Sequence, residues 1–196
     1  YPGPGGHDLR SVHNLYGNGH NVIVVGASEP AGVSDATAAL ITALQEAGGG
    51  PGELVVGRLR DVKLSDDYTV PRDPREMRIW ESSAYYGDGG FFGWNCISKH
   101  MAAYYVTGDE YHAREVLRLS FPDAEAIKYI EEIDGERIEN KHDPLAGPYH
   151  YSAIMMILFW DLIEEDPIFT DEQRLAITNA LARQLNHRKS EGVYGR

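Results

Sequence analysis

The segment from Tyr149 to Glu165 constrains the fold more than any other part of this sequence, because it predicts a helix that is apolar on nearly every side. Its central run, Ala153 to Trp160, is almost entirely hydrophobic. A helix of this kind has to be surrounded by other helices. The run is far shorter than the roughly 20 residues that cross a bilayer, so it predicts the centre of a helical domain and not a membrane span.

A second helix should follow directly and lie antiparallel to the first. Thr170 and Gln173 have the spacing of a capping box, and the helix that they open extends through Leu185. Ile177 and Leu181 recur at four-residue spacing on one of its faces. The connection between the two helices, DPIFT, is short, which favours an antiparallel hairpin.

Further helices are expected upstream, from about Arg75 onward. One should run from about Trp94 to Val106 and stop at Gly108, and Asp109 should cap the next. Phe121-Pro122-Asp123 begins another, whose apolar side carries Ala126, Ile127 and Ile130. This part of the chain therefore reads as a series of antiparallel helix hairpins.

The N-terminal part predicts a small β-α-β unit. Asn21 to Val25 is a β-branched run typical of a buried strand, a helix capped by Ser34 should extend to Glu46, and Glu53 to Leu59 should form a second strand parallel to the first. We expect a mainly α protein with a small N-terminal α/β unit at 1–65, which includes a Gly-rich N-terminal stretch, a linker at 66–75 and the helix hairpins at 76–196.

Charge and composition exclude several kinds of partner. The chain has 18 Lys and Arg against 30 Asp and Glu, a formal charge of -12, so its field repels nucleic acids and anionic membranes. The hydrophobic content of 42% is sufficient for a core. Cys96 is the single cysteine and is expected to be a small buried residue.

No cofactor or metal is expected. The glycines between Gly26 and Gly32 follow a strand but lack the G-x-G-x-x-G spacing and the lysine of a phosphate-binding loop. His7, His13 and His20 lie in the Gly-rich stretch without the paired spacing of a metal site.

Two phrases, AAYYVTGDEYHAREVL and ILFWDLIEEDPIFTDEQRLAITNAL, carry a family resemblance. From about Trp80 to Arg196 the chain resembles the α/α-toroid carbohydrate-active enzymes, which include heparinase II/III-like polysaccharide lyases and several glycoside hydrolases. The resemblance implies an incomplete ring, completed by further chain or by a partner chain. The first residue is Tyr1 and not Met, so a processed product located in the extracellular space or the periplasm is expected.

The resemblance also implies an acid-base site. Tyr149, His150 and Tyr151 would supply the proton-transfer groups of a lyase, and Asn95 or His100 would neutralise a uronate carboxylate. The alternative is that all of these are ordinary polar residues at helix ends. Likewise, Arg188 fits either a substrate carboxylate or compensation of the negative end of its helix.

A glycine- and aromatic-rich loop offers a glycan-binding surface, because sugar rings stack on aromatic faces. Its candidates are Trp80, Tyr85, Tyr86 and Trp94, which could equally form the core of the first hairpin. For hydrolysis, Asp88 in this loop would need a second carboxylate, Glu81 or Asp161, although a glycine-flanked Asp is also a common turn former.

The predicted function is therefore a carbohydrate-active protein that binds a poly- or oligosaccharide in a helical cleft, with β-elimination as the leading reaction. Glycoside hydrolysis is the first alternative, and it avoids the repulsion between an acidic protein and a polyuronate. The second alternative is a non-catalytic protein that assembles with other chains.

Overall fold

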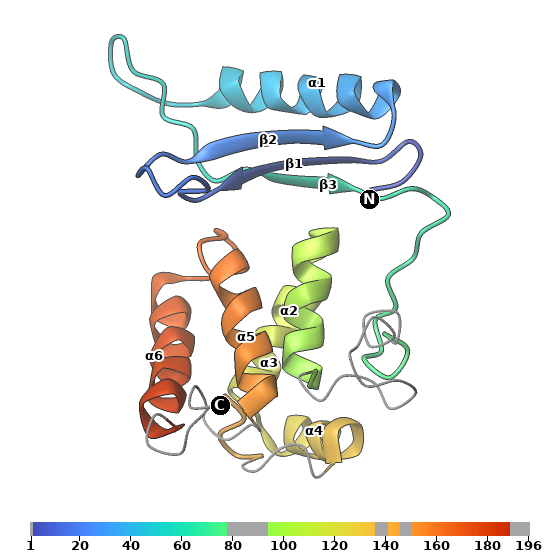
Figure 1. Ribbon diagram of the computed structural model, residues 1–196, viewed down its shortest axis with the longest axis vertical. Helices are drawn as coiled ribbons and strands as arrows, with labels where there is room; N and C mark the ends of the chain where they lie inside the picture. Colours follow the sequence, from blue (N-terminus) through green and yellow to red (C-terminus); the bar gives the residue numbers. More distant parts are fainter. Residues whose placement is uncertain (1, 78–93, 136–140, 146–149, 189–196) are drawn as a thin grey trace. The chain divides into compact units, whose positions relative to one another are not determined.

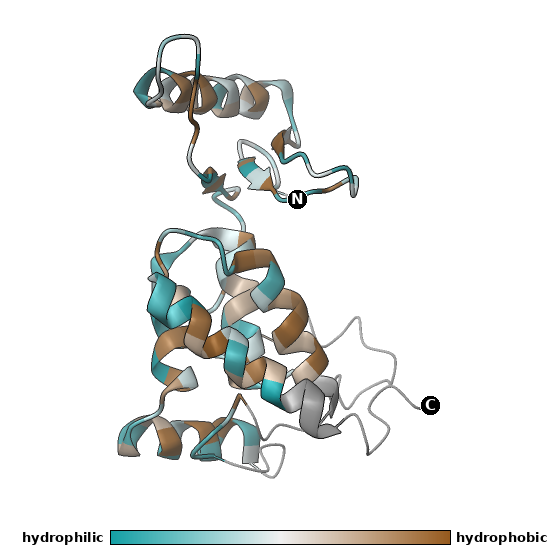
Figure 2. Ribbon diagram, turned by 90° about the vertical axis from the view of Figure 1, so that its left-hand side faces the viewer, coloured by the Kyte–Doolittle hydropathy of each residue, from teal (hydrophilic) through white to brown (hydrophobic). Residues whose placement is uncertain are grey.

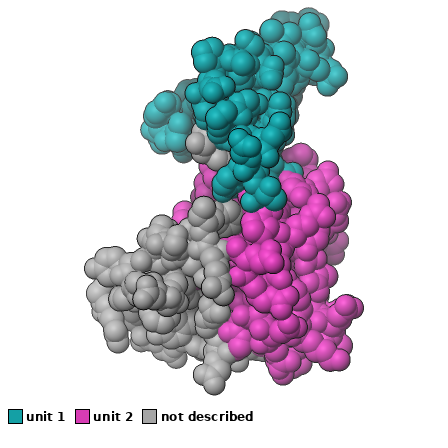
Figure 3. Space-filling model, turned by 90° about the vertical axis from the view of Figure 1, so that its right-hand side faces the viewer, with its two compact units in different colours: residues 1–69, 106–108 teal, residues 70–105, 109–196 magenta. Residues whose placement is uncertain are grey.

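The computed structural model describes residues 2–77, 94–135, 141–145 and 150–188, with the backbone alone for 150–152 and 184–188. The chain divides into two units (Figure 3). The first unit comprises Tyr1–Thr69 with Val106–Gly108, and the second unit comprises Val70–Tyr105 with Asp109–Arg196. The described part is mainly helical and holds six helices and one small antiparallel sheet of three strands. Each unit is described separately below.

The sheet of the first unit has the strand order β2-β1-β3 and differs from the predicted one (Figure 1). Strand β1 (His7–Val12) lies in the middle and is antiparallel to both β2 (Val22–Ala27) and β3 (Arg60–Lys63). Consequently β2 and β3 run parallel to each other, as expected of strands joined through a helix. They are not hydrogen-bonded neighbours, however, because β1, a strand that the sequence did not predict, lies between them.

The central strand β1 was not predicted, because its sequence lacks the run of β-branched residues that is typical of a buried strand. The strand begins with polar His7 and Asp8 and continues with Arg10 and Ser11, and only Leu9 is a large buried hydrophobe, at 2% exposure. The predicted strand at 53–59 was also wrong. In that range only Val55 makes an isolated antiparallel bridge, to Gly48, and the strand itself begins at Arg60.

Helix α1 (Pro30–Glu46) begins one turn earlier than Ser34. Proline is favoured in the first helical turn, where its missing N–H would have no partner in any case. Ser34 is thus inside the helix, where its hydroxyl donates to the Pro30 carbonyl, 3.5 Å away, and the predicted cap was wrong. A side chain at Gly32 would lie 2.4 Å from the Gly6 carbonyl oxygen, so glycine allows α1 to pack directly on the chain leading into β1.

Five helices follow, and they agree closely with the predicted hairpins: α2 (Cys96–Thr107), α3 (Glu110–Ser120), α4 (Ala124–Asp134), α5 (His150–Ile163) and α6 (Asp171–Arg188). Gly108 follows α2 with φ +69°, which confirms the predicted stop. Asp109 accepts a hydrogen bond from the Tyr111 amide, and Asp123 caps α4 in the same way. No helix in the described ranges is long and apolar enough to cross a membrane.

Helices α5 and α6 form the antiparallel hairpin that the sequence predicted (Figure 1). The capping box is present, since the Gln173 amide donates to the Thr170 hydroxyl at 3.2 Å and the Thr170 amide to the Gln173 side chain at 2.9 Å. The Trp160 indole N–H donates to the Thr178 hydroxyl at 2.9 Å and ties the two helices together.

The core of the second unit is built from the apolar faces of these helices, which appear as brown segments in Figure 2. Helix α5 contributes Met156, Trp160 and Ile163, and α6 contributes Ile177 and Leu181. The expectation that α5 is covered on every side is only partly met, because Leu158 is 48% exposed. Its side chain is therefore available for a contact with something outside the described core.

Candidate functional site

The structure describes only some of the predicted site residues. Trp80, Tyr85, Tyr86, Asp88 and Tyr149 lie outside the described residues. His150 and Tyr151 are the first residues of α5, and Arg188 is the last residue of α6, each with its backbone alone described. The structure therefore gives side-chain surroundings for Trp94, Asn95 and His100. Of the two candidate partners of Asp88, Asp161 lies exposed on α5 and Glu81 is outside the described residues.

Asn95 holds the beginning of α2. Its side-chain oxygen accepts a hydrogen bond from the backbone N–H of Ser98 at 2.8 Å, and the backbone N–H of Asn95 donates to the Ser98 hydroxyl at 3.0 Å. The side-chain N–H group approaches the Met156 sulfur at 3.5 Å. Asn95 has no exposed surface, so this arrangement is that of a buried helix cap.

Trp94 packs against α5 with little surface left for a ligand. Its ring centroid lies 5.4 Å from that of Phe159, and the residue is 9% exposed.

Cys96, at the beginning of α2, is fully buried, and its backbone N–H donates to the carboxylate of Asp134 at 3.0 and 3.1 Å. Burial, together with the Asp134 carboxylate, raises the pKa of the Cys96 thiol, which keeps it protonated and unreactive.

His100 forms a buried pair with His112, with the two Nδ1 atoms 3.0 Å apart. The exposed fractions are 0% and 1%. Burial and neighbouring positive charge, from His112 and Arg118, lower the pKa of His100 to about 3. Burial also lowers the pKa of His112 to about 4, so both rings are neutral at neutral pH.

The hydrogen bond between the two Nδ1 atoms restricts which ring nitrogens carry a proton. One Nδ1 has to donate and the other to accept. The Nε2 atom of His100 is buried with no hydrogen-bond partner in the described structure. An unpaired lone pair is less costly there than an unpaired N–H, which favours His100 as the donor through Nδ1. A ring in this position presents no surface to a ligand.

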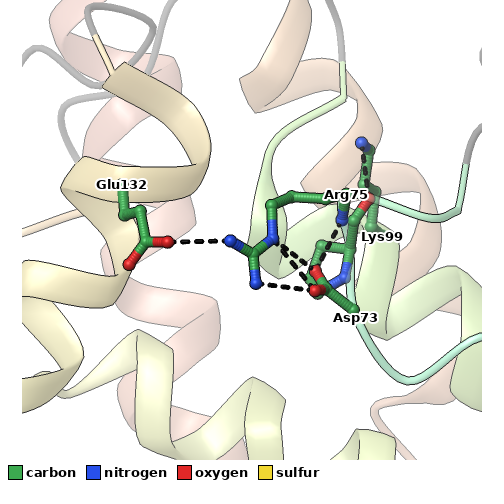
Figure 4. Close-up of polar contacts among 5 residues, drawn as sticks. Asp73, Arg75, Lys99 and Glu132 are labelled. Carbon is green, nitrogen blue, oxygen red and sulfur yellow. Dashed lines mark hydrogen bonds and ion pairs between the residues drawn. The ribbon is translucent and has the colours of Figure 1, made fainter.

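Charged residues form a network near His100, which interacts electrostatically with one of them, Asp73. Arg75 binds Asp73 through its guanidinium at 2.7 Å and reaches Glu132 of α4, also at 2.7 Å (Figure 4). The hydrogen bond from Arg75 lowers the pKa of Asp73. Lys99, almost fully buried, donates to the Pro74 carbonyl at 3.0 Å (Figure 4). This network attaches the segment before the aromatic-rich loop to α2 and α4.

A cavity of about 530 Å³ lies elsewhere in the second unit, between the end of α3, the segment 141–145 and one face of α6. Its volume falls within the range of about 300–1,000 Å³ that small-ligand sites occupy. The lining is mixed, with polar Ser120, His142, Asp143, Asn179 and Arg183 beside apolar Phe121, Pro122, Leu145, Ala176 and Ala180. Spacings of three and four residues place the α6 members on one helical face.

Two charges face each other at this cavity. The Arg183 guanidinium lies 3.7 Å from the Asp143 carboxylate, and the two side chains are 61% and 43% exposed. A pair so open to water contributes little to stability. Phe121 is 52% exposed, and the buried Ser120 hydroxyl has no partner in the described structure. The cavity thus combines one unused hydroxyl and an open charge pair with an apolar wall.

This cavity was not predicted from the sequence, although a weak signal for it exists on α6. Asn179 and Arg183 stand one helical turn apart, with Ala176 and Ala180 on the same face, so polar groups are interrupted by small residues that leave space. The contribution of His142 and Asp143 comes from a loop and has no periodic signal. Among the described residues, no group of three or more His, Cys, Asp or Glu is placed to hold a metal ion.

Comparisons with known protein families, with curated protein sequences and with solved structures gave no match to this chain.

Proposed function

We propose that this protein binds a glycan through its helical unit, with the cavity beside α6 as part of the binding site. The observation that carries the proposal is the composition of the cavity wall. Sugars present hydroxyl groups at their edges and C–H groups on their faces. Asp143, Asn179 and Arg183 offer acceptors and donors for the former, and the exposed ring of Phe121 offers an apolar surface for the latter.

The proposed catalytic residues adjoin this region in the chain. Helix α5 begins at His150, shortly after Leu145 of the cavity wall. Because α5 and α6 are antiparallel, the start of α5 and the end of α6 belong to the same end of the hairpin (Figure 1). This supports the proposal that His150 and Tyr151 act on a glycan that also occupies the cavity.

The proposed reaction is β-elimination from a uronate. A base, His150 or Tyr151, removes the proton from C5, the C4–O bond breaks, a C4=C5 double bond forms, and an acid protonates the departing oxygen. A hydrogen-bond donor beside the carboxylate would stabilise the negative charge that develops on it. Hydrolysis with Asp88 as one carboxylate is the alternative, and the negative net charge of the protein favours it.

The helical architecture is proposed to be of the α/α-toroid type. The antiparallel α5–α6 hairpin supports this, but further helices would be needed to close a ring. A non-catalytic assembly protein is the second candidate function, favoured by the exposure of Leu158 at 48% and Leu175 at 62% on this hairpin. Light scattering of the purified chain tests whether it assembles with other copies of itself, because a strictly monomeric species would contradict self-assembly.

Binding and turnover need separate measurements. Saturation-transfer NMR with a panel of neutral and uronate oligosaccharides should detect binding, and ultraviolet absorbance should detect the unsaturated uronate that elimination produces. Substitution His150→Ala should abolish elimination and leave binding in place, whereas His20→Ala, in an exposed loop, serves as the matched control. If no member of the panel binds the wild-type protein, the glycan proposal is wrong.

A further inference from the structure

The charge pair at the cavity carries a more specific inference, which rests on the proposed glycan-binding function. Asp143 and Arg183 come from different segments, the loop at 141–145 and helix α6, and both face the cavity. Their separation of 3.7 Å is longer than a good charge-assisted hydrogen bond, which has a donor–acceptor distance of about 2.7–2.9 Å. The two groups are close enough to share a ligand and retain hydrogen-bonding capacity of their own.

We infer that Asp143 makes this cavity a subsite for an uncharged sugar unit with two adjacent hydroxyl groups. A hydroxyl group donates one hydrogen bond and accepts others. Two adjacent hydroxyls can therefore donate to the Asp143 carboxylate and accept from the Arg183 guanidinium, so the sugar bridges the two charges. Asn179, on the same face of α6 as Arg183, provides a further donor and acceptor.

A uronate fits the same position less well. Its carboxylate would approach Arg183 but would also meet the negative charge of Asp143, and like charges at this distance repel. The charges of Asp143 and Arg183 cancel, so their pair has no net attraction for an anion. The overall charge of -12 adds to the repulsion. Asp143 is therefore a specificity-determining residue that rejects acidic sugars at this subsite.

The apolar lining completes the fit. Phe121 and Pro122 border the cavity at the end of α3, and Leu145, Ala176 and Ala180 contribute further apolar surface. These side chains can cover the C–H face of a sugar ring while its hydroxyl edge meets the charge pair. The volume of about 530 Å³ suits a short saccharide segment, with the rest of a longer chain extending outside.

The test compares wild type with Asp143→Asn by isothermal titration calorimetry. The probes are neutral hexasaccharides (cellohexaose, xylohexaose and mannohexaose) and hexagalacturonate, at one fixed salt concentration. The asparagine variant has the same shape but lacks the charge. At least one neutral probe should bind the wild type more tightly than hexagalacturonate does. In the variant that probe should bind about tenfold more weakly, a loss of about 1.4 kcal/mol, and hexagalacturonate about tenfold more tightly.

Glu110→Gln is the matched control, because it breaks an Arg114–Glu110 pair of similar exposure, at 66% and 64%, on α3 and outside the cavity lining. It should leave every affinity unchanged. A wild type that prefers hexagalacturonate, or a variant with wild-type affinities for all probes, overturns the inference while the glycan proposal stands. Absence of binding by every probe overturns both. Circular dichroism of each variant confirms that it is folded.

Discussion

The buried pair His100–His112 should make the protein lose stability in mild acid. In the unfolded chain each imidazole titrates near 6.5, whereas in the folded protein the pKa values are about 3 and about 4. The folded values are lowered, so the stability that the neutral pair provides is fully present above pH 6.5 and is lost as the pH falls. The loss ends only when the folded protein itself takes up protons, near pH 4 and below.

The size of the effect at a given pH follows from how far that pH lies below the unfolded pKa of each histidine, as long as the folded protein still binds no proton. At about pH 5 each histidine is about 1.5 pH units below its unfolded pKa and still neutral in the folded protein, which corresponds to about 2 kcal/mol each. The two together lower the free energy of unfolding by about 4 kcal/mol, a large share of the 5–15 kcal/mol that is typical of a domain.

The geometry explains why the folded protein resists the extra proton. Protonation of both Nδ1 atoms would place two N–H groups against each other across 3.0 Å. Protonation of His100 at Nε2 would create a buried N–H without a partner in the described structure. Arg118 further disfavours positive charge on His100. Around His112 the Asp109 carboxylate favours positive charge and Arg72 disfavours it, and burial outweighs both.

Urea unfolding between about pH 5 and pH 7 measures the effect, because most paired carboxylates titrate below this window. The free energy of unfolding should rise with pH by about 2.7 kcal/mol per pH unit at the steepest point, the value for a difference of two protons. His112→Gln should reduce this slope by about half. His20→Gln, on an exposed loop, should leave it as in the wild type. A wild-type slope near zero in this window would refute the reasoning.

Three further predictions concern the helix ends. Asn95→Ala should lower the free energy of unfolding by about 1–3 kcal/mol, because it removes the acceptor of the Ser98 amide and leaves that buried N–H unpaired; thermal unfolding checks this. Asp134→Ala should cost a similar amount through the lost hydrogen bond to the Cys96 amide, and Cys96 should then react faster with a thiol reagent under native conditions. Thr170→Ala should cost only about 1 kcal/mol, because its cap is exposed, and a larger loss would mean that the hairpin depends on the box more than its hydrogen bonds indicate.

The helices could be predicted because their signals are local. Asp109, Asp123 and Thr170 each cap the helix that the sequence assigned to them, and Gly108 ends α2 as its position suggested. Such signals act within one turn of a helix, so they can be read without knowledge of the fold.

The sheet and the cavity depend on contacts distant in sequence. The pairing of β1 with β3 joins residues fifty or more positions apart, and no pattern within either strand specifies it. The same holds for the cavity, in which Asp143 meets Arg183 only through the packing of a loop on α6. Asn95 and His100 illustrate the converse, since polar residue types that suggested a ligand prove to be occupied by hydrogen bonds inside the helical unit.

The central position of β1 also determines the order in which the first unit can assemble. During synthesis β1 emerges first, and β2 can pair with it as soon as the following turn is complete. The opposite edge of β1 has no strand partner until residues 60–63 arrive, after the whole of α1 has been made. Because β2 and β3 share no hydrogen bonds, loss of β1 would leave two separate strands and no sheet. The amides of β1 should therefore exchange with solvent more slowly than those of either neighbouring strand.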